Sequence, residues 1–552
     1  MIADIHITEK SFGDKTLMKD VKFSVDDGEK VGVVGRNGVG KSTLFGILSG
    51  KDTDYTGEVI FRRGITVATT AQEHHGLGDQ TVMSYILGGL PEYSKLKKII
   101  DEYPLTMGDN MRKIEEYTQA LERFDQKGFY QVEEKIEREL SKFQLDGYGN
   151  RRISSLSGGQ KRLVEIVKIM HSEAHLALID EPTNHMDYVA KQQFIDWMNS
   201  QPHQAMLIIT HDRDVLGQVD RIVEIKDGQA VSYRGNYDAY LKQNAQATTA
   251  GMNNFEQIEK RIVNLKQKVL DYQRLKEKSR NPGTIQKFKR LENEARSELA
   301  ELSEMEKPTF WIDKESVGQL DYKSAERYGK FKSRNIRLSM KDASSRSQHV
   351  LVRAENVAVG IGERILFEDV NIDLREGEAI EIRGRNGAGK TTLIRMILAS
   401  GKSFDGGPVL YSGDIFLDPQ VRIGVYEQEI DERYLSDPLE KAIEKLYMSR
   451  DLSISDTKIR QLLADYLFTD ADRMTPLARL SGGQKARFKI ISMLANDPQL
   501  LILDEPTNHL DLPSIEELET ALAKYSGAIL YVSHDNYFRE KLGGKVVQIG
   551  AE

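Results

Sequence analysis

Short apolar runs rich in β-branched residues recur along the chain, and they alternate with longer stretches whose apolar residues are spaced by three or four. Three such runs are 31–34, 205–210 and 528–533. Alternating strands and helices of this kind are typical of a largely parallel sheet with helices on its faces. The pattern therefore predicts an α/β fold.

The middle of the chain follows a different pattern. Apolar residues at helical spacing predict a helix over 253–280, and Asn281-Pro282-Gly283 is expected to break it. A second helix is predicted over 284–306, ahead of Pro308. The two helices would form a hairpin whose tip lies near residues 277–285.

An internal repeat sets the domain organisation. Gly-x-x-x-x-Gly-Lys-Ser/Thr ends at Ser42 and again at Thr391, and each copy is followed by Leu-Ser-Gly-Gly-Gln and then by an apolar run ending in Asp-Glu-Pro. We predict two tandem ATPase domains of the P-loop class, joined by a helical hairpin linker. The predicted boundaries are 1–242, 243–348 and 349–552.

The two copies differ in one interval. From Gln72 to Ser157 is 85 residues, whereas from Gln428 to Ser481 is 53. The extra sequence is charged and amphipathic, so we expect a helical arm inserted in the first copy at about residues 91–130.

Composition narrows the class of protein. The chain has 552 residues, 39% hydrophobic and 29% charged, with no cysteine, which excludes disulfides and thiolate metal sites. No apolar run approaches the roughly 18 residues of a membrane-spanning helix, and the N-terminus lacks a basic region followed by an apolar stretch. We therefore expect a cytosolic protein.

The glycine-rich motif lets a bare backbone loop surround phosphate oxygens with N–H groups at a helix N-terminus. Its lysine would reach the β- and γ-phosphates, and the following hydroxyl would coordinate Mg²⁺. The residues assigned to ATP binding here are Gly35, Asn37, Gly38, Gly40, Lys41, Ser42 and Thr43, and in the second copy Gly384, Asn386, Gly387, Gly389, Lys390, Thr391 and Thr392.

Residues for hydrolysis follow in the same order in both copies. Asp180 and Asp504 end apolar strands and could hold Mg²⁺, with Glu181 and Glu505 placed to polarise the attacking water. The next strand ends in a histidine that could contact the γ-phosphate. The remaining candidates are His211 and His534, Gln72 and Gln428 as sensors of Mg²⁺ and water, and the signature residues Ser157, Gly159, Gln160, Ser481, Gly483 and Gln484.

One position differs between the copies. Phe12 precedes the first glycine-rich loop and could stack on adenine, although a core aromatic is the alternative. The aligned residue of the second copy is Ile361, which offers apolar contact alone. The two sites are therefore not expected to be identical in nucleotide affinity.

Charge is distributed unevenly. The net charge is −8, yet residues 251–350 carry 22 Lys and Arg against 15 Asp and Glu. A polyanionic partner is therefore expected at the linker, although charged helices are more often only a solvated surface. The cations near the hairpin tip are Arg274, Lys276, Lys278, Arg280, Lys287, Lys289 and Arg290.

These motifs resemble those of the ATP-binding cassette superfamily, and the arrangement as a whole is similar to the ABC-F family. Both cassettes are fused without membrane domains, and both acidic motifs extend to Glu-Pro-Thr-Asn-His, within Asp180–Asp187 and Asp504–Asp511. The resemblance covers essentially the full chain.

The resemblance implies that the cassettes close face to face on two ATP molecules in one monomer. Each set of P-loop, acidic and histidine residues would face the signature of the other copy. ABC-F proteins bind the ribosomal E site, and their linker reaches toward the P-site tRNA and the peptidyl-transferase centre. Regulation of translation is the function implied.

Two alternatives remain open. The same fold serves antibiotic-resistance proteins that protect the ribosome, and neither the arm nor the tip settles the subtype. An ATPase subunit of an ABC transporter with separate membrane partners is disfavoured by the long basic linker.

Overall fold

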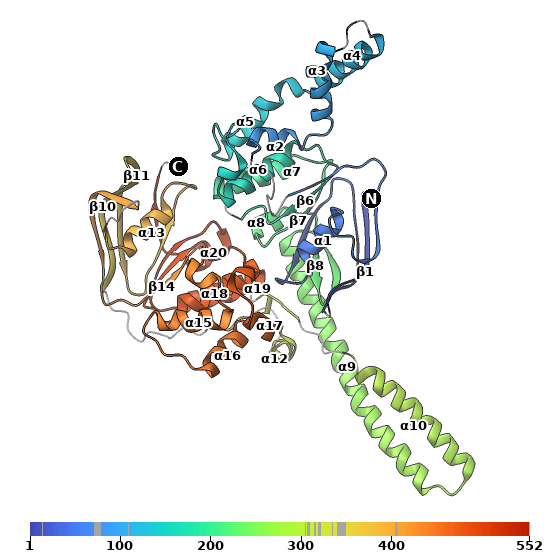
Figure 1. Ribbon diagram of the computed structural model, residues 1–552. Coiled ribbons are helices and arrows are strands. Elements are labelled where there is room, and N and C mark those ends of the chain that lie inside the picture. Colours follow the sequence, from blue (N-terminus) through green and yellow to red (C-terminus); the bar gives the residue numbers. More distant parts are fainter. Residues whose placement is uncertain are drawn as a thin grey trace. The chain divides into compact units, whose positions relative to one another are not determined.

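The computed structural model describes two compact units, Met1–Tyr237 with Ile336–Glu552, and Asp238–Asn335 (Figure 1). The first unit contains both cassettes and the second contains the linker helices. The description covers residues 1–550 except 14, 71–78, 107, 109, 185, 304, 306–309, 314, 315, 318–321, 334, 339–348, 403–406 and 428.

Each cassette is built on a sheet of mostly parallel strands. The first sheet has the order β5-β6-β7-β3-β8-β9 and the second β14-β15-β16-β12-β17. Every described pairing in them is parallel except β8 with β9. The strands are β3 (Lys30–Gly35), β5 (Val67–Thr69), β6 (Leu176–Asp180), β7 (Ala205–Ile209), β8 (Arg221–Lys226), β9 (Gln229–Arg234), β12 (Ala379–Arg383), β14 (Ile423–Tyr426), β15 (Leu500–Asp504), β16 (Ala528–Val532) and β17 (Lys545–Gln548).

The burial of the central strands accounts for their apolar sequences. All five residues of β6, β7, β15 and β16 are buried, because both faces of each central sheet are covered, one mainly by helices and the other largely by the antiparallel sheet. Such strands are continuous apolar runs rather than alternating ones. The predicted α/β class is therefore confirmed in both copies.

A smaller antiparallel sheet accompanies each central sheet. Its order is β2-β1-β4 in the first cassette and β11-β10-β13 in the second. In β1, Ile5 and Ile7 are buried in the same apolar cluster as Val31 and Val33 of β3. The strands are β1 (Ala3–Phe12), β2 (Lys15–Val25), β4 (Thr56–Phe61), β10 (Val350–Ile361), β11 (Arg364–Arg375) and β13 (Pro408–Leu417).

Helices follow the strands along the chain in both copies. In the first they are α1 (Lys41–Leu48), α2 (Val82–Leu87), α3 (Tyr93–Thr106), α4 (Met111–Gln126), α5 (Val132–Lys142), α6 (Gly158–His171), α7 (Tyr188–Asn199) and α8 (Arg213–Leu216). In the second they are α13 (Lys390–Leu398), α14 (Glu432–Leu435), α15 (Leu439–Met448), α16 (Asp456–Asp465), α17 (Asp470–Arg473), α18 (Gly482–Leu494), α19 (Leu512–Ala523) and α20 (Asn536–Leu542).

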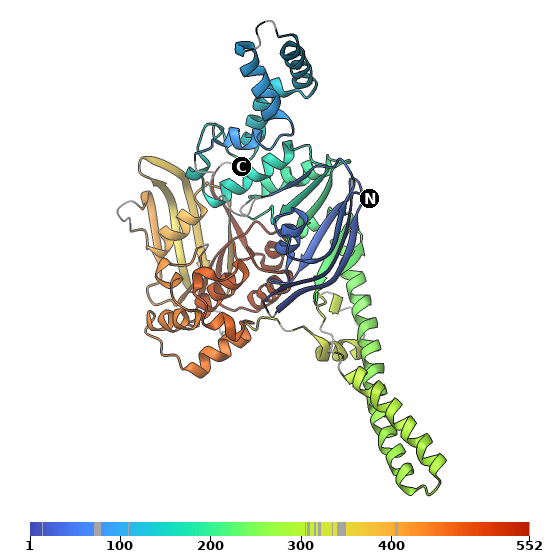
Figure 2. The ribbon, with the colours of Figure 1, turned by 45° about the vertical axis from the view of Figure 1, so that its right-hand side comes forward.

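Helices α3 and α4 occupy the interval where the first copy is longer. They lie side by side in both ribbon views (Figures 1 and 2). Three aromatic rings join them to the chain that follows: the centroids of Tyr93 and Phe129, and of Phe124 and Phe129, are both 5.2 Å apart. This small aromatic cluster holds the two helices together with little other core.

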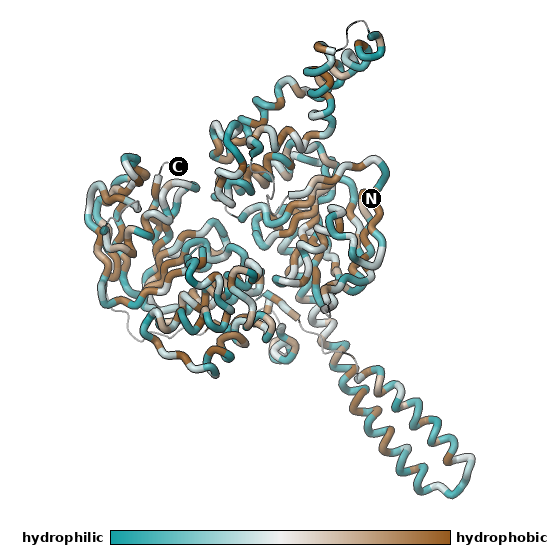
Figure 3. The backbone as a smooth tube through the Cα atoms, viewed as in Figure 1, coloured by the Kyte–Doolittle hydropathy of each residue, from teal (hydrophilic) through white to brown (hydrophobic). Residues whose placement is uncertain are grey.

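The linker unit contains α9 (Tyr237–Lys278), α10 (Pro282–Ser303) and α12 (Tyr322–Phe331). Figure 3 shows α9 and α10 as largely hydrophilic with interspersed apolar residues, in contrast to the apolar runs of the sheets. Leu265, Val269 and Ala295 form the buried contact between the two helices. None of the described helices combines the length and apolar composition needed to span a bilayer.

Two details of the hairpin differ from the sequence prediction. Helix α9 begins at Tyr237 rather than near residue 253, and its early turns are held by packing: Met252 is buried and Asn244 Nδ2 donates to the carbonyl of Trp311 at 2.8 Å. The predicted break between the two helices is present at residues 279–281, and α10 begins at Pro282 rather than near residue 284. Asn281 Oδ1 accepts from Gly283 N at 2.9 Å, so Asn281 caps a helix whose first residue is proline.

Candidate active sites

Each glycine-rich loop connects a central strand to the helix that follows, β3 to α1 and β12 to α13. Gly40 and Gly389 precede these helices with φ of 103° and 99°, a conformation that disfavours any side chain. A Cβ on Gly40 would also lie 2.8 Å from Leu17 Cδ2. Neither helix has a side-chain cap, so its first N–H groups are available to an anion.

The two lysines of these loops fold back over them. Lys41 Nζ donates to the carbonyls of Gly35 at 2.6 Å and Arg36 at 3.1 Å, and Lys390 Nζ donates to Gly384 at 2.8 Å. Both lysines are 8% exposed, and burial lowers the pKa of each. A phosphate would supply the negative charge that a buried ammonium lacks here.

A hydroxyl and a carboxylate meet beside each loop. Ser42 Oγ donates to Asp180 Oδ2 at 3.3 Å, and Thr391 Oγ1 donates to Asp504 Oδ2 at 2.8 Å. No group of three or more His, Cys, Asp or Glu that could hold a metal occurs within the described residues. The oxygens present suit Mg²⁺, which is commonly bound through one or two protein oxygens together with phosphate.

The two glutamates adopt an unusual backbone conformation. Glu181 and Glu505 have φ of 46° and 49°, in the left-handed region that non-glycine residues rarely occupy. Each N–H still donates to the neighbouring strand, Glu181 to Ile209 at 2.7 Å and Glu505 to Val532 at 3.0 Å. The chain therefore leaves the sheet at the glutamate, and strain of this kind is concentrated at functional sites.

A histidine lies beside each glutamate. His211 Nε2 is 3.4 Å from Glu181 Oε1, and His534 Nε2 is 3.4 Å from Glu505 Oε1. Burial and the adjacent aspartate raise the pKa of Glu181 to about 8 and that of Glu505 to about 7. Burial also lowers the pKa of both histidines, His211 to about 3. The imidazoles are therefore neutral near neutral pH, and each glutamate titrates in the physiological range.

The signature serines cap helices. Ser157 Oγ accepts from Gln160 N, and Gln160 Oε1 accepts from Ser157 N at 3.0 Å, which completes a capping box at the start of α6. Ser481 and Gln484 form the same arrangement at α18. In this role the hydroxyl accepts a bond and keeps its own hydrogen for a ligand, at the positive end of a helix.

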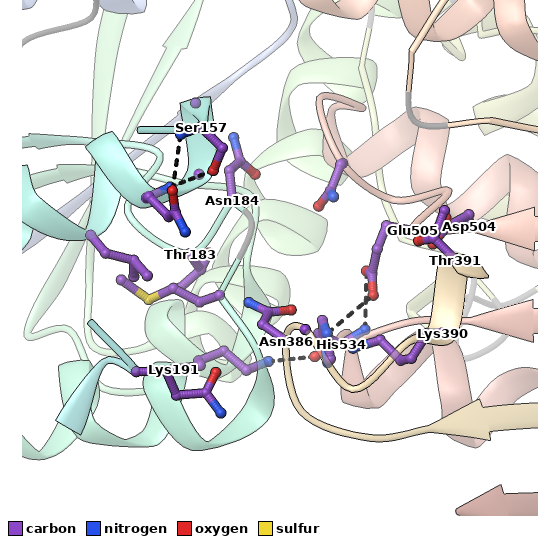
Figure 4. A pocket seen from close by; sticks show the side chains of 18 of the residues that line it. Ser157, Thr183, Asn184, Lys191, Asn386, Lys390, Thr391, Asp504, Glu505 and His534 are labelled. Carbon is purple, nitrogen blue, oxygen red and sulfur yellow. Dashed lines mark hydrogen bonds and ion pairs between the residues drawn. The ribbon is translucent and has the colours of Figure 1, made fainter. Parts of the chain in front are cut away.

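The structure brings each loop together with the signature of the other copy. One pocket, of about 450 Å³, includes Asn37, Gly38, Gly40, Lys41, Ser42, Thr43, Asp180, Glu181, His211, Ser481 and Gly483. The other, of about 940 Å³, includes Ser157, Gly159, Gln160, Asn386, Gly387, Gly389, Lys390, Thr391, Thr392, Asp504, Glu505 and His534 (Figure 4). The larger pocket also reaches Glu181 and His211.

Four predicted residues do not line these pockets. Gly35 and Gly384 lie against neighbouring main chain: a Cβ would lie 2.6 Å from the carbonyl oxygen of Ile225 and 2.4 Å from that of Ile549. Gln484 Nε2 instead donates to Asp472 Oδ1 at 2.7 Å. The fourth, Phe12, is treated below, and Gln72 and Gln428 lie outside the described residues.

Phe12 is 57% exposed at the end of β1. The ammonium of Lys10 lies 4.7 Å from the centroid of its ring, so one face already has a cationic neighbour. Ile361, its counterpart, lines the larger pocket. The difference between the two positions is therefore present in the structure as well as in the sequence.

Two functional candidates were missed. Asp187 and Asp511 each cap the helix that follows, through Ala190 N at 2.9 Å and Ser514 N at 3.1 Å. The other carboxylate oxygen accepts from the P-loop of the opposite copy: Asn386 N donates to Asp187 at 2.9 Å and Asn37 N to Asp511 at 3.0 Å. The repeated Asn-His-x-Asp sequence was the available signal.

Close approach also explains one signature glycine. Asn37 Nδ2 donates to the carbonyl of His509 at 3.0 Å, and a Cβ on Gly483 would lie only 2.0 Å from that nitrogen. Gly483 therefore leaves room for the P-loop asparagine of the first copy.

At the hairpin tip, six of the seven predicted cations are exposed: Arg274, Lys278, Arg280, Lys287, Lys289 and Arg290. Lys276 differs, because its Nζ donates to Glu292 Oε2 at 2.6 Å and joins α9 to α10. Its charge is thus engaged within the hairpin.

Comparison with known proteins agrees with this geometry. The family model described as "ABC transporter" matches residues 18–184 and 367–508, which is more than half of the chain. "ABC transporter F family member 2" of Arabidopsis thaliana is 29% identical over 98% of this chain and 75% of its own length. This chain belongs to the ABC-F family of ATP-binding cassette proteins.

Two bacterial relatives of this ABC-F protein have names that describe their roles. The energy-dependent translational throttle protein EttA of Mycobacterium tuberculosis is 28% identical over 96% of this chain and 88% of its own length. The ribosome protection protein VmlR of Bacillus subtilis is 28% identical over 96% and 83%. The archaeal ribosome recycling factor aABCE1, crystallised with the stalk protein aP1, has a TM-score of 0.58 at 16% identity, covering 99% of this chain and 87% of its own, which shows the shared fold.

Proposed function

We propose that this ABC-F ATPase binds the ribosome near the E site and regulates translation, with its linker acting on the P-site tRNA and the peptidyl-transferase region. ATP binding closes the cassettes and fixes the linker, and hydrolysis releases the protein. The names of EttA and VmlR connect relatives of similar length to translation and the ribosome.

The observation that carries the proposal is the composite character of both pockets. Each contains the loop, acidic residues and histidine of one copy together with the signature serine of the other. A nucleotide bound there would contact both cassettes at once, so its γ-phosphate could stabilise the closed state and its loss could release it.

Within each site we assign one role to each group. Lys41 and Lys390 bind the phosphates, and Ser42 with Asp180, or Thr391 with Asp504, hold Mg²⁺. Mg²⁺ would neutralise phosphate charge.

The remaining residues act on the water and on the closed state. Glu181 or Glu505 orients and deprotonates the attacking water, while the neutral His211 or His534 contacts the γ-phosphate. The signature serines donate to the same phosphate from the opposite copy. Phe12 stacks on adenine in the first site. Gln72 and Gln428 sense Mg²⁺ and the attacking water, one in each site.

The linker supplies the surface for RNA. The six exposed cations lie around the turn between α9 and α10, where a phosphate backbone can approach. We propose Lys276 as a support for the hairpin rather than an RNA contact. The proposed domains remain 1–242, 243–348 and 349–552, in a monomer located in the cytoplasm.

Co-sedimentation with ribosomes tests the proposal. The Glu181→Gln/Glu505→Gln variant should bind ATP without hydrolysing it and should pellet with ribosomes only when ATP is present. As a matched control, the same variant with Lys41→Ala and Lys390→Ala should stay in the supernatant. Absence of pelleting, with ATP binding confirmed, would contradict the ribosomal role.

The hairpin charges can be tested separately. Replacing Arg280, Lys287 and Lys289 by Glu in the trapped variant should weaken pelleting and reduce its salt dependence. Replacing three exposed cations of the arm, Lys95, Lys97 and Lys98, serves as the control. An equal loss from both sets would argue against a specific role of the hairpin.

A second candidate function is protection of the ribosome from antibiotics, which the similarity to VmlR favours. Expression in a susceptible host should then raise the inhibitory concentration of a drug that acts near the peptidyl-transferase centre. If no drug class shows a shift, the regulatory function stands alone.

A further inference from the structure

The interface between the cassettes carries a charged group in one copy that the other copy lacks. Lys191 stands four residues after Asp187, and the residue four after Asp511 is Ile515. Asp214 stands three residues after His211, where the second copy has Tyr537. Only the first copy therefore carries the lysine and the carboxylate at these positions.

Lys191 connects the first cassette to the histidine of the second. It is 4% exposed on α7, and its Nζ donates to Asp214 Oδ2 at 2.5 Å and to the backbone carbonyl of His534 at 2.9 Å. Asp212 Oδ2 is 3.3 Å away. Figure 4 shows the lysine side chain directed at His534 from the opposite copy.

Further hydrogen bonds extend this connection to the glutamate. The backbone N–H of His534 donates to Glu505 Oε2 at 3.2 Å, so one residue is bonded to Lys191 through its carbonyl and to Glu505 through its amide. On the other side, Asn536 Nδ2 donates to Asp214 Oδ2 at 2.8 Å. The chain of contacts spans both cassettes and ends at the reacting groups of one site.

The charge of Lys191 is maintained despite burial. Burial opposes it, but Asp212 and Asp214 outweigh this effect and raise the pKa of Lys191. A buried ion pair adds little to stability compared with an apolar contact of the same size. Ile515, which lines the larger pocket as Lys191 does, shows that an apolar residue is used at the equivalent place.

We propose that Lys191 is a positioning residue for the ATP site of Glu505 and His534: it couples closure of the cassettes to the placement of His534, and the site of Glu181 has no such device. The inference rests on the proposed hydrolytic function. It predicts that the two sites differ in how strongly turnover depends on the opposite cassette.

Single-site backgrounds separate the two sites. In Glu181→Gln only the site of Glu505 can turn over, and there Lys191→Met should lower kcat by at least about tenfold with little change in KM, because small displacements of positioned groups have large effects on rate. In Glu505→Gln the same substitution should change kcat by less than about twofold, since the site of Glu181 does not use the contact. Lys191→Arg, which keeps the charge, should restore much of the loss.

The outcomes are distinguishable. Equal loss in both backgrounds, or no loss in either, would overturn the proposal. If both backgrounds lack ATPase activity before Lys191 is changed, the proposed function itself fails. Should Lys191→Met fail to fold, as judged by loss of ATP binding, Asp214→Asn provides the second variant. It keeps the lysine, removes the nearer of its two carboxylate partners, and must reduce kcat in the Glu181→Gln background alone.

Discussion

At the scale of single residues, the two glutamates that we propose as catalytic, Glu181 and Glu505, differ from their neighbours in both backbone conformation and burial. Their left-handed φ turns the chain out of the sheet, and burial beside an aspartate raises both pKa values. A glutamate whose pKa lies near the working pH is suited to accept a proton from water. Both pKa values are raised by the same two causes, burial and the neighbouring aspartate.

A pH dependence follows at this scale. A carboxyl group must lose its proton to act as a base. The value of kcat/KM for ATP, which reports the free enzyme, should therefore be low below the raised glutamate pKa and should rise as pH passes through it. The single-site variants Glu505→Gln and Glu181→Gln should each show a rising limb near neutral pH, well above the ordinary glutamate range. The measurement is steady-state ATPase activity between pH 6 and 9, roughly the range bracketing these values. Activity that is constant across this pH range in both variants would contradict the role of a raised glutamate pKa.

At the scale of elements, the linker hairpin is held by few apolar contacts and by buried charge. Glu292 of α10 is 5% exposed, and it accepts from Lys276 at 2.6 Å and from Gln273 at 3.2 Å, both on α9. The hydrogen bond from Lys276, with further bonds from Arg296 and Gln273, lowers the pKa of Glu292 to about 2 despite its burial. One carboxylate thus connects the two helices close to the tip.

The sign of the pH effect on the hairpin is fixed by this lowered pKa. The stabilisation of the hairpin by ionised Glu292 is present above the ordinary glutamate pKa of 4.5 and is lost as pH falls toward about 2. Glu292→Gln should speed amide hydrogen exchange in α9 and α10 at neutral pH, measured on the full chain. Glu294→Gln is the matched control, since Glu294 pairs with Arg290 at an exposed position. Equal protection of the amides from exchange in the two variants would contradict the role of Glu292 in holding the hairpin together.

At the scale of the whole molecule, the ATPase unit depends on contacts between its two copies. Besides Lys191, Arg213 of the first copy is paired with Glu519 of the second, with Nη1 and Oε1 3.0 Å apart and side chains 7% and 5% exposed. The equivalent positions of the opposite copies are Asn536 and Ile195, so this pair is also one-sided. We expect this pair to favour one arrangement of the two cassettes.

Breaking that pair should weaken closure. Glu519→Gln would leave Arg213 buried without its carboxylate, a change that typically destabilises by about 3–5 kcal/mol. Thermal unfolding of the Glu181→Gln/Glu505→Gln variant should therefore show a smaller ATP-dependent rise in Tm when Glu519→Gln is added. Glu134→Gln, which removes an exposed partner of Arg138, is the control and should have little effect. An unchanged ATP-dependent shift would contradict the prediction.

The sequence alone determined what is local to a motif. The glycine-rich loops, the acidic strand ends and the signature serines are motifs of residues a few positions apart, so their spacing was sufficient to propose their roles. The α/β class was equally accessible, because fully buried parallel strands require continuous apolar runs. The tandem duplication was also visible in the sequence, since each motif recurs in the same order in both copies.

Only the tertiary structure decided contacts between residues far apart in the chain. Asn37 meets Asp511 and Lys191 meets His534 across separations of 474 and 343 residues, which no periodicity encodes. The early start of α9 was hidden for a related reason: a polar stretch became helical because Met252 and Asn244 are held by later residues. Local pattern specifies what a segment can form, whereas long-range packing selects its boundaries and its partners.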